Sequence, residues 1–316
     1  MTNGGQDEPP SRVGRYSVLR PLGLGGMSTV YRAYDPELDR QIALKIIKRH
    51  SPDDRGPARL IREARAMARI NHPNVAVVHD VGLVDNQVYI AMELLEGPTL
   101  HEWFLETPRP WTEVLRMYLQ AGRGLVAAHE VGLAHRDFKP DNVMLGADGR
   151  PRVLDFGLAR PSADSDDDGE LLGDDDEDLD ERLRLGETHG DETYGDDEFD
   201  LQAEVTRHGM ITGTPAYMAP EQHLGAPGGP AADQFAFCVS LWEALYRRRP
   251  FAGSSFFEVA DAIIEGRRQA PPRRTRVPGW LRHHLERGMA IEPQRRHPSM
   301  RSLLGSLVFT FRVMHG

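Results

Sequence analysis

The fold of this chain is decided by two stretches, His135-Arg136-Asp137-Phe138-Lys139-Pro140-Asp141-Asn142 and, thirteen residues after Asn142, Asp155-Phe156-Gly157. Asp137 can accept a proton from a hydroxyl group, and Lys139 can neutralise a phosphoryl group in transfer. Asn142 and Asp155 supply the oxygen ligands that magnesium prefers. This spacing of one base, one cation and two metal ligands is specific, and it indicates phosphoryl transfer from ATP.

A glycine-rich turn lies between two expected strands near the N-terminus: Leu22-Gly23-Leu24-Gly25-Gly26-Met27-Ser28-Thr29-Val30. Because glycine has no side chain, the backbone of such a turn can close over phosphates. The turn departs from G-x-G-x-x-G, since Ser28 stands where the third glycine would be, and an ordinary hairpin is the alternative. A dinucleotide-binding Rossmann turn is excluded because a strand, not a helix, follows.

Lysine is rare in this chain, so its positions are informative. The 316 residues contain 38 Lys and Arg, and only Lys45, Lys48 and Lys139 are lysine. Lys45 ends the apolar run Ile42–Lys45 and would be costly to bury without an anion. Glu63, in the helix expected next, is the natural partner, and the alternative is a surface lysine on an edge strand. A compact ammonium at Lys45 and Lys139, in a chain that otherwise uses arginine, supports a phosphate-handling site.

Hydrophobic periodicity divides the chain into a strand-rich part and a helical part. The first part is expected to have one helix at Pro57–Ile70 and strands within Tyr16–Ala33, Gln41–Ile47, Val75–Val84 and Gln87–Leu94. Helices are expected at Leu100–Leu105, Thr112–Val131, Ala231–Tyr246, Phe256–Glu265, Trp280–Met289 and Met300–Val313. This order predicts an α+β fold.

On these motifs the chain resembles the eukaryotic-like (Hanks-type) serine/threonine protein kinases of bacteria. The resemblance covers about Tyr16 to Phe311 and also includes Ala219-Pro220-Glu221, Asp233 and Arg296. It implies the two-lobed protein-kinase fold, with a small β-rich N-lobe at 16–95 and a larger helical C-lobe at 96–311. Residues 1–15 are expected to be a disordered N-terminal segment, and 161–205 an acidic low-complexity insert in the activation segment.

The resemblance also implies an ATP site and the roles of its residues. ATP would be contacted by Leu22, Gly23, Leu24, Gly25, Gly26, Met27, Ser28, Thr29, Val30, Ala43, Lys45, Met92, Glu93, Leu95 and Met144. Among these, Met92 would be the gatekeeper, and Lys45, paired with Glu63, would hold the α- and β-phosphates. Asn142 and Asp155 would bind Mg²⁺, or Mn²⁺ in its place, and Asp137 would accept the proton of the substrate hydroxyl.

Several further residues take roles from the same resemblance. Lys139 and Thr214 point to serine or threonine as the acceptor. Asp233 would anchor the catalytic-loop backbone, and Glu221 and Arg296 would form a buried ion pair.

Regulation is expected to act through Arg136, because an arginine before the catalytic aspartate usually needs a phosphate or acidic partner in this family. Thr206 and Thr212 are the candidate phosphoacceptors, and the alternative is that both are ordinary loop threonines. A phosphate at either position would add about -1.5 to -2 charge and pair with arginines.

Negative charge is concentrated in one segment. Residues 161–200 contain 19 Asp/Glu and 2 Arg, so the net charge of -10 divides into -17 there and +7 elsewhere. Three interpretations stay open: a solvated loop without a specific role, a regulatory segment that competes for Arg136 or the substrate groove, and a cation site. The last rests on Asp164–Leu171, which follows the start of an EF-hand loop, although Asp175 replaces the usual final glutamate.

Composition narrows the class of protein. No signal peptide or membrane-spanning run is present in the sequence, so a cytoplasmic protein without membrane insertion is expected. Cys238 is the single cysteine and is expected to be a buried helix residue. No histidine spacing indicates zinc, and no basic-aromatic cluster indicates nucleic acid.

The expected partners are proteins with serine or threonine acceptors, and a homodimer would serve autophosphorylation. Two other functions stay open: a pseudokinase that acts as a binding scaffold, and a small-molecule kinase of related fold. The intact set of charged residues argues against the scaffold, and the Ala219–Glu221 segment, which shapes a peptide site, argues against the small-molecule kinase.

Overall fold

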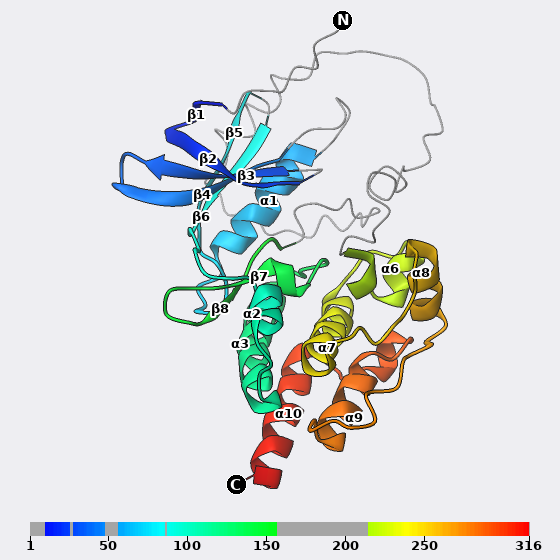
Figure 1. Ribbon diagram of the computed structural model, residues 1–316. Helices are drawn as coiled ribbons and strands as arrows, with labels where there is room; N and C mark the ends of the chain where they lie inside the picture. Colours follow the sequence, from blue (N-terminus) through cyan, green and yellow to red (C-terminus); the bar gives the residue numbers. More distant parts are fainter. Residues whose placement is uncertain (1–9, 26–27, 48–55, 86, 157–213, 316) are drawn as a thin grey trace, which may run out of the picture. The chain divides into compact units, whose positions relative to one another are not determined.

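The structure is a computed structural model that describes residues 10–25, 28–47, 56–85, 87–156 and 214–315 (Figure 1). The side chains of residues 56–59, 214 and 315 lie outside the described part. The acidic segment 161–205 and residues 1–9 also lie outside it, so their predicted character stays a prediction.

A six-stranded antiparallel sheet forms the first part of the chain, in the order β1-β2-β3-β4-β6-β5 (Figure 1). Its strands are β1 (Arg12–Val13), β2 (Tyr16–Leu24), β3 (Ser28–Asp35), β4 (Arg40–Ile47), β5 (Val78–Val84) and β6 (Gln87–Met92). Helix α1 (Gly56–Ala68) packs against β5 and β6. The buried face of this helix presents Ile61, Ala64 and Met67, in keeping with helical periodicity.

Strand β4 is central, and its register places Lys45 between Val30 of β3 and Ile90 of β6. Lys45 is buried, so the alternative of a surface lysine on an edge strand is wrong.

The helical part contains α2 (Leu100–Glu106), α3 (Trp111–Glu130), α6 (Pro220–His223), α7 (Pro230–Tyr246), α8 (Phe256–Ile264), α9 (Gly279–Gly288) and α10 (Met300–His315). The short hairpin of β7 (Val143–Leu145) and β8 (Pro151–Val153) follows the catalytic motif, and short 3-10 helices lie at Pro140–Asn142, Thr214–Tyr217 and Pro293–Arg295. The α+β class predicted from the sequence is confirmed.

The structure differs from the sequence prediction at the edges of elements. Strand β1 lies inside the segment expected to be disordered, because Val13 is buried and pairs with Tyr16. Helix α10 extends past Phe311, the expected end of the domain, to His315. These edges depend on tertiary packing, which periodicity does not report.

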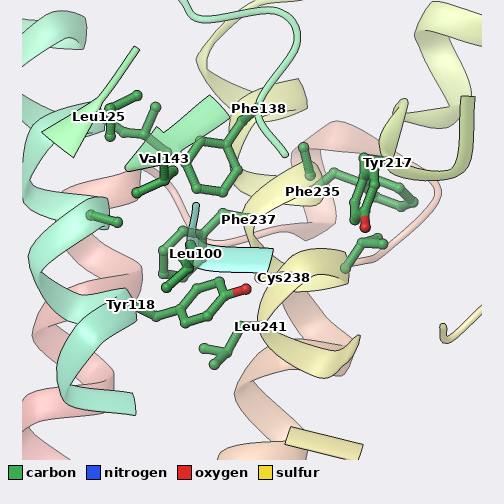
Figure 2. Packing of buried hydrophobic residues seen from close by; sticks show 14 of the residues in the cluster. Leu100, Tyr118, Leu125, Phe138, Val143, Tyr217, Phe235, Phe237, Cys238 and Leu241 are labelled. Carbon is green, nitrogen blue, oxygen red and sulfur yellow. The ribbon is translucent and has the colours of Figure 1, made fainter. Parts of the chain in front are cut away.

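Helix α7 forms the centre of the helical part. Tyr118 of α3 packs edge-on against Phe237 of α7, and its hydroxyl donates to the Ser240 carbonyl oxygen at 3.0 Å. Phe138, from the catalytic motif, lies on the other side of Phe237, with ring centroids 5.8 Å apart (Figure 2). Cys238 is fully buried in the same helix, and burial raises the pKa of its thiol, which confirms the prediction of an inert core cysteine.

A buried ion pair ties α6 to the chain before α10. The Arg296 guanidinium meets both Glu221 carboxylate oxygens at 2.7 Å. Its remaining N–H groups donate to the carbonyl oxygens of Ala231, Ala290 and Ile291. The Arg296 side chain is 0% exposed. All five of its donors are therefore satisfied, as burial of a cation requires.

We expect Arg296→Ala to lower the free energy of unfolding by about 3–5 kcal/mol, because it leaves the Glu221 carboxylate without its cation. Arg295→Ala is the matched control, since the Arg295 side chain is 75% exposed and should lose little stability. Denaturant titration of both variants tests this, and equal stability losses would contradict the role given to Arg296.

Candidate active site

The backbone that carries Asp137 is held by a carboxylate from α7. Asp233 accepts hydrogen bonds from the backbone N–H groups of His135 and Arg136, each at 2.7 Å. Its Oδ2 also lies 2.7 Å from His129 Nε2, at the end of α3. Because Asp233 is 1% exposed, these bonds are made in a site closed to water, where they are strong. The anchoring role predicted for Asp233 agrees with this geometry.

Arg136 needs such support because its backbone is left-handed, with φ 64°. That conformation is unfavourable for a residue with a side chain. Gln222 Nε2 donates to the Arg136 carbonyl oxygen at 3.0 Å, and Arg136 Nε donates to the Gly228 carbonyl oxygen at 3.1 Å. Bonds from both sides thus hold the strained residue before Asp137.

Asp137, Lys139 and Asn142 converge in the next turn. Lys139 Nζ lies 3.2 Å from Asp137 Oδ2. Asn142 Nδ2 donates to the Asp137 carbonyl oxygen at 2.8 Å and approaches Asp137 Oδ2 at 3.3 Å. The Asp137 side chain is 30% exposed, so a substrate hydroxyl can reach it. The structure therefore brings together a carboxylate, a cation and an amide, as their spacing in the sequence predicts.

Asp155 is placed beside this turn by two hydrogen bonds to the backbone of the preceding residue, Leu154. The Leu154 N–H donates to the Asn142 carbonyl oxygen at 2.9 Å, and His135 Nε2 lies 2.7 Å from the Leu154 carbonyl oxygen. Asp155 itself is left-handed, with φ 55°. Phe156 is fully buried, with its ring 4.8 Å from that of His135. The chain is thus held on both sides of Asp155, and the Asp155 carboxylate meets Lys45.

The ion pairs of Lys45 and Glu63 differ from the sequence prediction. Lys45 Nζ lies 2.9 Å from Asp155 Oδ1. Glu63 Oε1 lies 3.3 Å from Arg136 Nη1. The predicted pairing of Lys45 with Glu63 is therefore replaced by one in which Lys45 meets the other nearby carboxylate. Because a lysine that is 4% exposed must have an anion, Asp155 satisfies the requirement that led to the prediction.

The residues expected around the adenine lie on neighbouring strands and the segment after β6. Ala43 of β4 is opposite Met92 of β6. Val30 of β3 is opposite Lys45, which lies two residues after Ala43 on β4. The Glu93 N–H donates to the Val77 carbonyl oxygen at 2.8 Å. Leu95 is half-buried, and its N–H makes no backbone bond to the described residues. Met144 is the middle residue of β7, which follows the 3-10 helix Pro140–Asn142.

Further polar residues around the site carried no sequence signal. Tyr217 donates a short hydrogen bond to Glu243, and Arg249 Nε donates to Glu243 at 3.2 Å. Arg249 also stacks over the Tyr217 ring at 5.6 Å, and burial raises the pKa of the Tyr217 hydroxyl. The contacts of Tyr217, His129 and Gln222 join segments 26 to 104 residues apart in the sequence, which no local motif reveals.

Some predicted site residues lie outside the described part: Gly26, Met27, Gly157, Thr206 and Thr212. Thr214 begins a described 3-10 helix, but its side chain does not belong to the described part. Leu22, Gly23 and Leu24 lie at the end of β2, Gly25 follows them, and Ser28 and Thr29 start β3. The Gly25 N–H donates to the Ser28 carbonyl oxygen at 2.9 Å, which closes the turn.

The described residues contain no group of three or more His, Cys, Asp or Glu side chains that could hold a metal ion. Within the same residues, no helix has the length and apolar character needed to cross a membrane.

Comparisons with known proteins agree on one family. A family model described as "Protein kinase domain" matches residues 16–174. Serine/threonine-protein kinase PknA of Mycobacterium tuberculosis is 33% identical over 295 residues, which cover 90% of this chain and 59% of that protein. PknL of the same organism is 34% identical over 272 residues, covering 82% and 58%. The pkn2 kinase of Myxococcus xanthus is 31% identical over 295 residues, covering 90% and 31%. The chain therefore spans less than two thirds of the length of these relatives.

We expect Asp233→Ala to lower the free energy of unfolding by about 3–5 kcal/mol, because it leaves two buried backbone N–H groups unpaired. Asp261→Ala on α8 is the control, since Asp261 is exposed and should lose little stability. Thermal and denaturant unfolding measure both variants. A stability loss no larger than that of the control would show that Asp233 does not anchor this turn.

Proposed function

The chain belongs to the protein kinase domain family, and from that membership we propose that it is an ATP-dependent serine/threonine protein kinase. The observation that carries the proposal is the turn in which Lys139 Nζ lies 3.2 Å from Asp137 Oδ2, with Asn142 bonded to the same aspartate. The relatives named as serine/threonine kinases support the same activity.

In the proposed reaction, Asp137 accepts the proton of a serine or threonine hydroxyl on a protein substrate. The hydroxyl oxygen forms a bond to the γ-phosphorus of ATP, the bond to the β-phosphate oxygen breaks, and ADP leaves. Lys139 neutralises the charge of the phosphoryl group in transfer. Because Asp233 fixes the backbone before Asp137, the base needs little reorganisation when the substrate binds.

The donor set fits a divalent cation of the kind that accompanies ATP. Asp155 offers a carboxylate, and Asn142 offers an amide oxygen, since its Nδ2 is used by Asp137. Both are hard oxygen ligands, which suit Mg²⁺ and also Mn²⁺. When bound, the cation would neutralise negative charge on the ATP phosphates, and Asn142 and Asp155 would hold it.

We further propose that two ion pairs exchange partners when ATP binds. Lys45 would leave Asp155 for the α- and β-phosphates, and Asp155 would turn to the cation. Glu63 would then leave Arg136 and pair with Lys45, as the sequence predicts. A phosphate on Thr206 or Thr212 would help this exchange by giving Arg136 a new anionic partner.

The acceptor class is serine or threonine, as Lys139 and Thr214 indicate by resemblance. Phosphorylation between two copies of the chain is the proposed route to a phosphate at Thr206 or Thr212, and it needs only a transient homodimer. A cytoplasmic location remains a prediction from the sequence.

We expect the purified chain to transfer phosphate from Mg·ATP to serine or threonine peptides. Asp137→Asn should lower the rate by about 10²–10⁴-fold, because proton transfer to the base is lost. Asp261→Asn, at an exposed position of α8, is the matched control and should retain the rate. The measurement is phosphate incorporation with phosphosite mapping.

Full incorporation by Asp137→Asn would contradict the role of Asp137. If the intact chain binds ATP but incorporates no phosphate into protein, the scaffold interpretation is favoured. Incorporation into a small metabolite without incorporation into peptides would favour the small-molecule kinase.

A further inference from the structure

An arginine-rich loop joins α8 to α9 on the helical part of the chain. Residues 266–285 contain six Arg and no Asp or Glu. We call residues 266–278 the arginine loop, and five of the six arginines lie in it: Arg267, Arg268, Arg273, Arg274 and Arg276. All five are exposed. None of them belongs to the site described above.

The arginine loop is anchored at both ends. The backbone of Arg268 forms an isolated antiparallel β-bridge with that of Phe251, and the Gln269 N–H donates to the Pro250 carbonyl oxygen at 2.7 Å. At the other end Pro278 leads directly into α9. The pair Pro271-Pro272 between these ends restricts the backbone further. Because the loop is held in advance, a ligand would lose little of its binding energy to ordering it.

The charge of the arginine loop is left largely unneutralised. Arg267 pairs with Glu265, and Arg282 on α9 pairs with Glu286 at 3.5 Å. By contrast, Arg273, Arg274 and Arg276 form no ion pair with any residue in the described ranges. These three cations lie within four positions of one another and repel, so an anion that bound them would relieve that cost.

Neighbouring contacts extend the positive surface along the loop. Arg268 Nη1 donates to the Glu286 carbonyl oxygen at 2.8 Å, at the far end of α9. Arg248, just after α7, donates to the carbonyl oxygen of Ala270. Five of the thirteen residues 266–278 are arginine. A ligand that carries several anionic groups fits such a sequence of cations better than one phosphate does.

The chemistry around the arginines favours a peptide over a membrane or a nucleic acid. No large apolar side chain is strongly exposed between residues 266 and 288, within the part of the chain described here, so nothing can insert into lipid. Trp280 is the one Trp, Tyr or Phe among residues 266–288, and it is half-buried and packs edge-on against Trp111, so this stretch lacks the series of exposed aromatic rings on which bases stack. The planar guanidinium group of an arginine can donate two parallel hydrogen bonds to one carboxylate.

We propose that the arginine loop is a binding site for a carboxylate-rich segment of a partner protein. The site is separate from phosphoryl transfer, and binding needs neither ATP nor turnover. Its affinity arises from several exposed ion pairs, so it falls as salt concentration rises.

The test measures binding of a fluorescent peptide rich in Asp and Glu to the full chain by anisotropy. Because residues 161–200 carry 19 Asp/Glu of their own, the peptide is titrated in large excess. The triple variant Arg273→Gln, Arg274→Gln, Arg276→Gln should bind it roughly tenfold more weakly. The exposed arginines of the control variant, Arg116→Gln, Arg123→Gln, Arg312→Gln, lie on α3 and α10, and this variant should bind like the parent.

A second peptide, with Asn and Gln in place of Asp and Glu, should not bind. Thermal unfolding shows that each variant is folded before binding is compared. Equal affinity of the parent and the loop variant, or equal binding of the two peptides, would overturn the proposal. So would binding of RNA or anionic vesicles by a chain that ignores the acidic peptide.

Discussion

The buried carboxylate of Asp233 is the interaction on which the rest of the site depends. It accepts the N–H groups of His135 and Arg136 from within α7, the most buried helix of the described chain. A charged acceptor in a dry environment binds strongly, and losing it would leave its donors unpaired. The left-handed backbone of Arg136 is held in this way, and Asp137 follows directly. Phe138 then packs on Phe237, so the catalytic turn is attached to the core by polar and apolar contacts together (Figure 2).

The other charged residues of the site form ion pairs that are less buried than the Asp233 carboxylate. Lys45 meets Asp155, and Glu63 meets Arg136. The side chains of Asp155 and Arg136 are 35% and 25% exposed, so exchange of partners costs less than it would in the core. We therefore propose a fixed catalytic aspartate beside ion pairs that a nucleotide or a phosphate can rearrange. Arg296 differs from these residues, because it is fully buried and all five of its N–H donors are already hydrogen-bonded.

The sequence predicts the main elements because their periodicity is long and regular, as in α3 and α7. It also predicts that Asp137, Lys139 and Asn142 meet, because they lie within one short turn. In this structure Lys45 pairs with Asp155 and not with the predicted Glu63, since either carboxylate satisfies the same electrostatic requirement and spacing does not choose between them. The sequence does not indicate His129 or Gln222 as residues of the site. Their hydrogen bonds join segments that only the tertiary fold brings together, and the residues themselves are unremarkable in the sequence.

We infer that α7 fixes the catalytic turn before any ligand binds, and hydrogen exchange of two backbone amides tests this. The amide protons of His135 and Arg136 should exchange as slowly as those of the α7 core, with or without Mg·ATP, because both are bonded to a carboxylate that is 1% exposed. Exchange of these two amides at the rate of an exposed loop in the free chain, with protection only after Mg·ATP is added, would contradict the account.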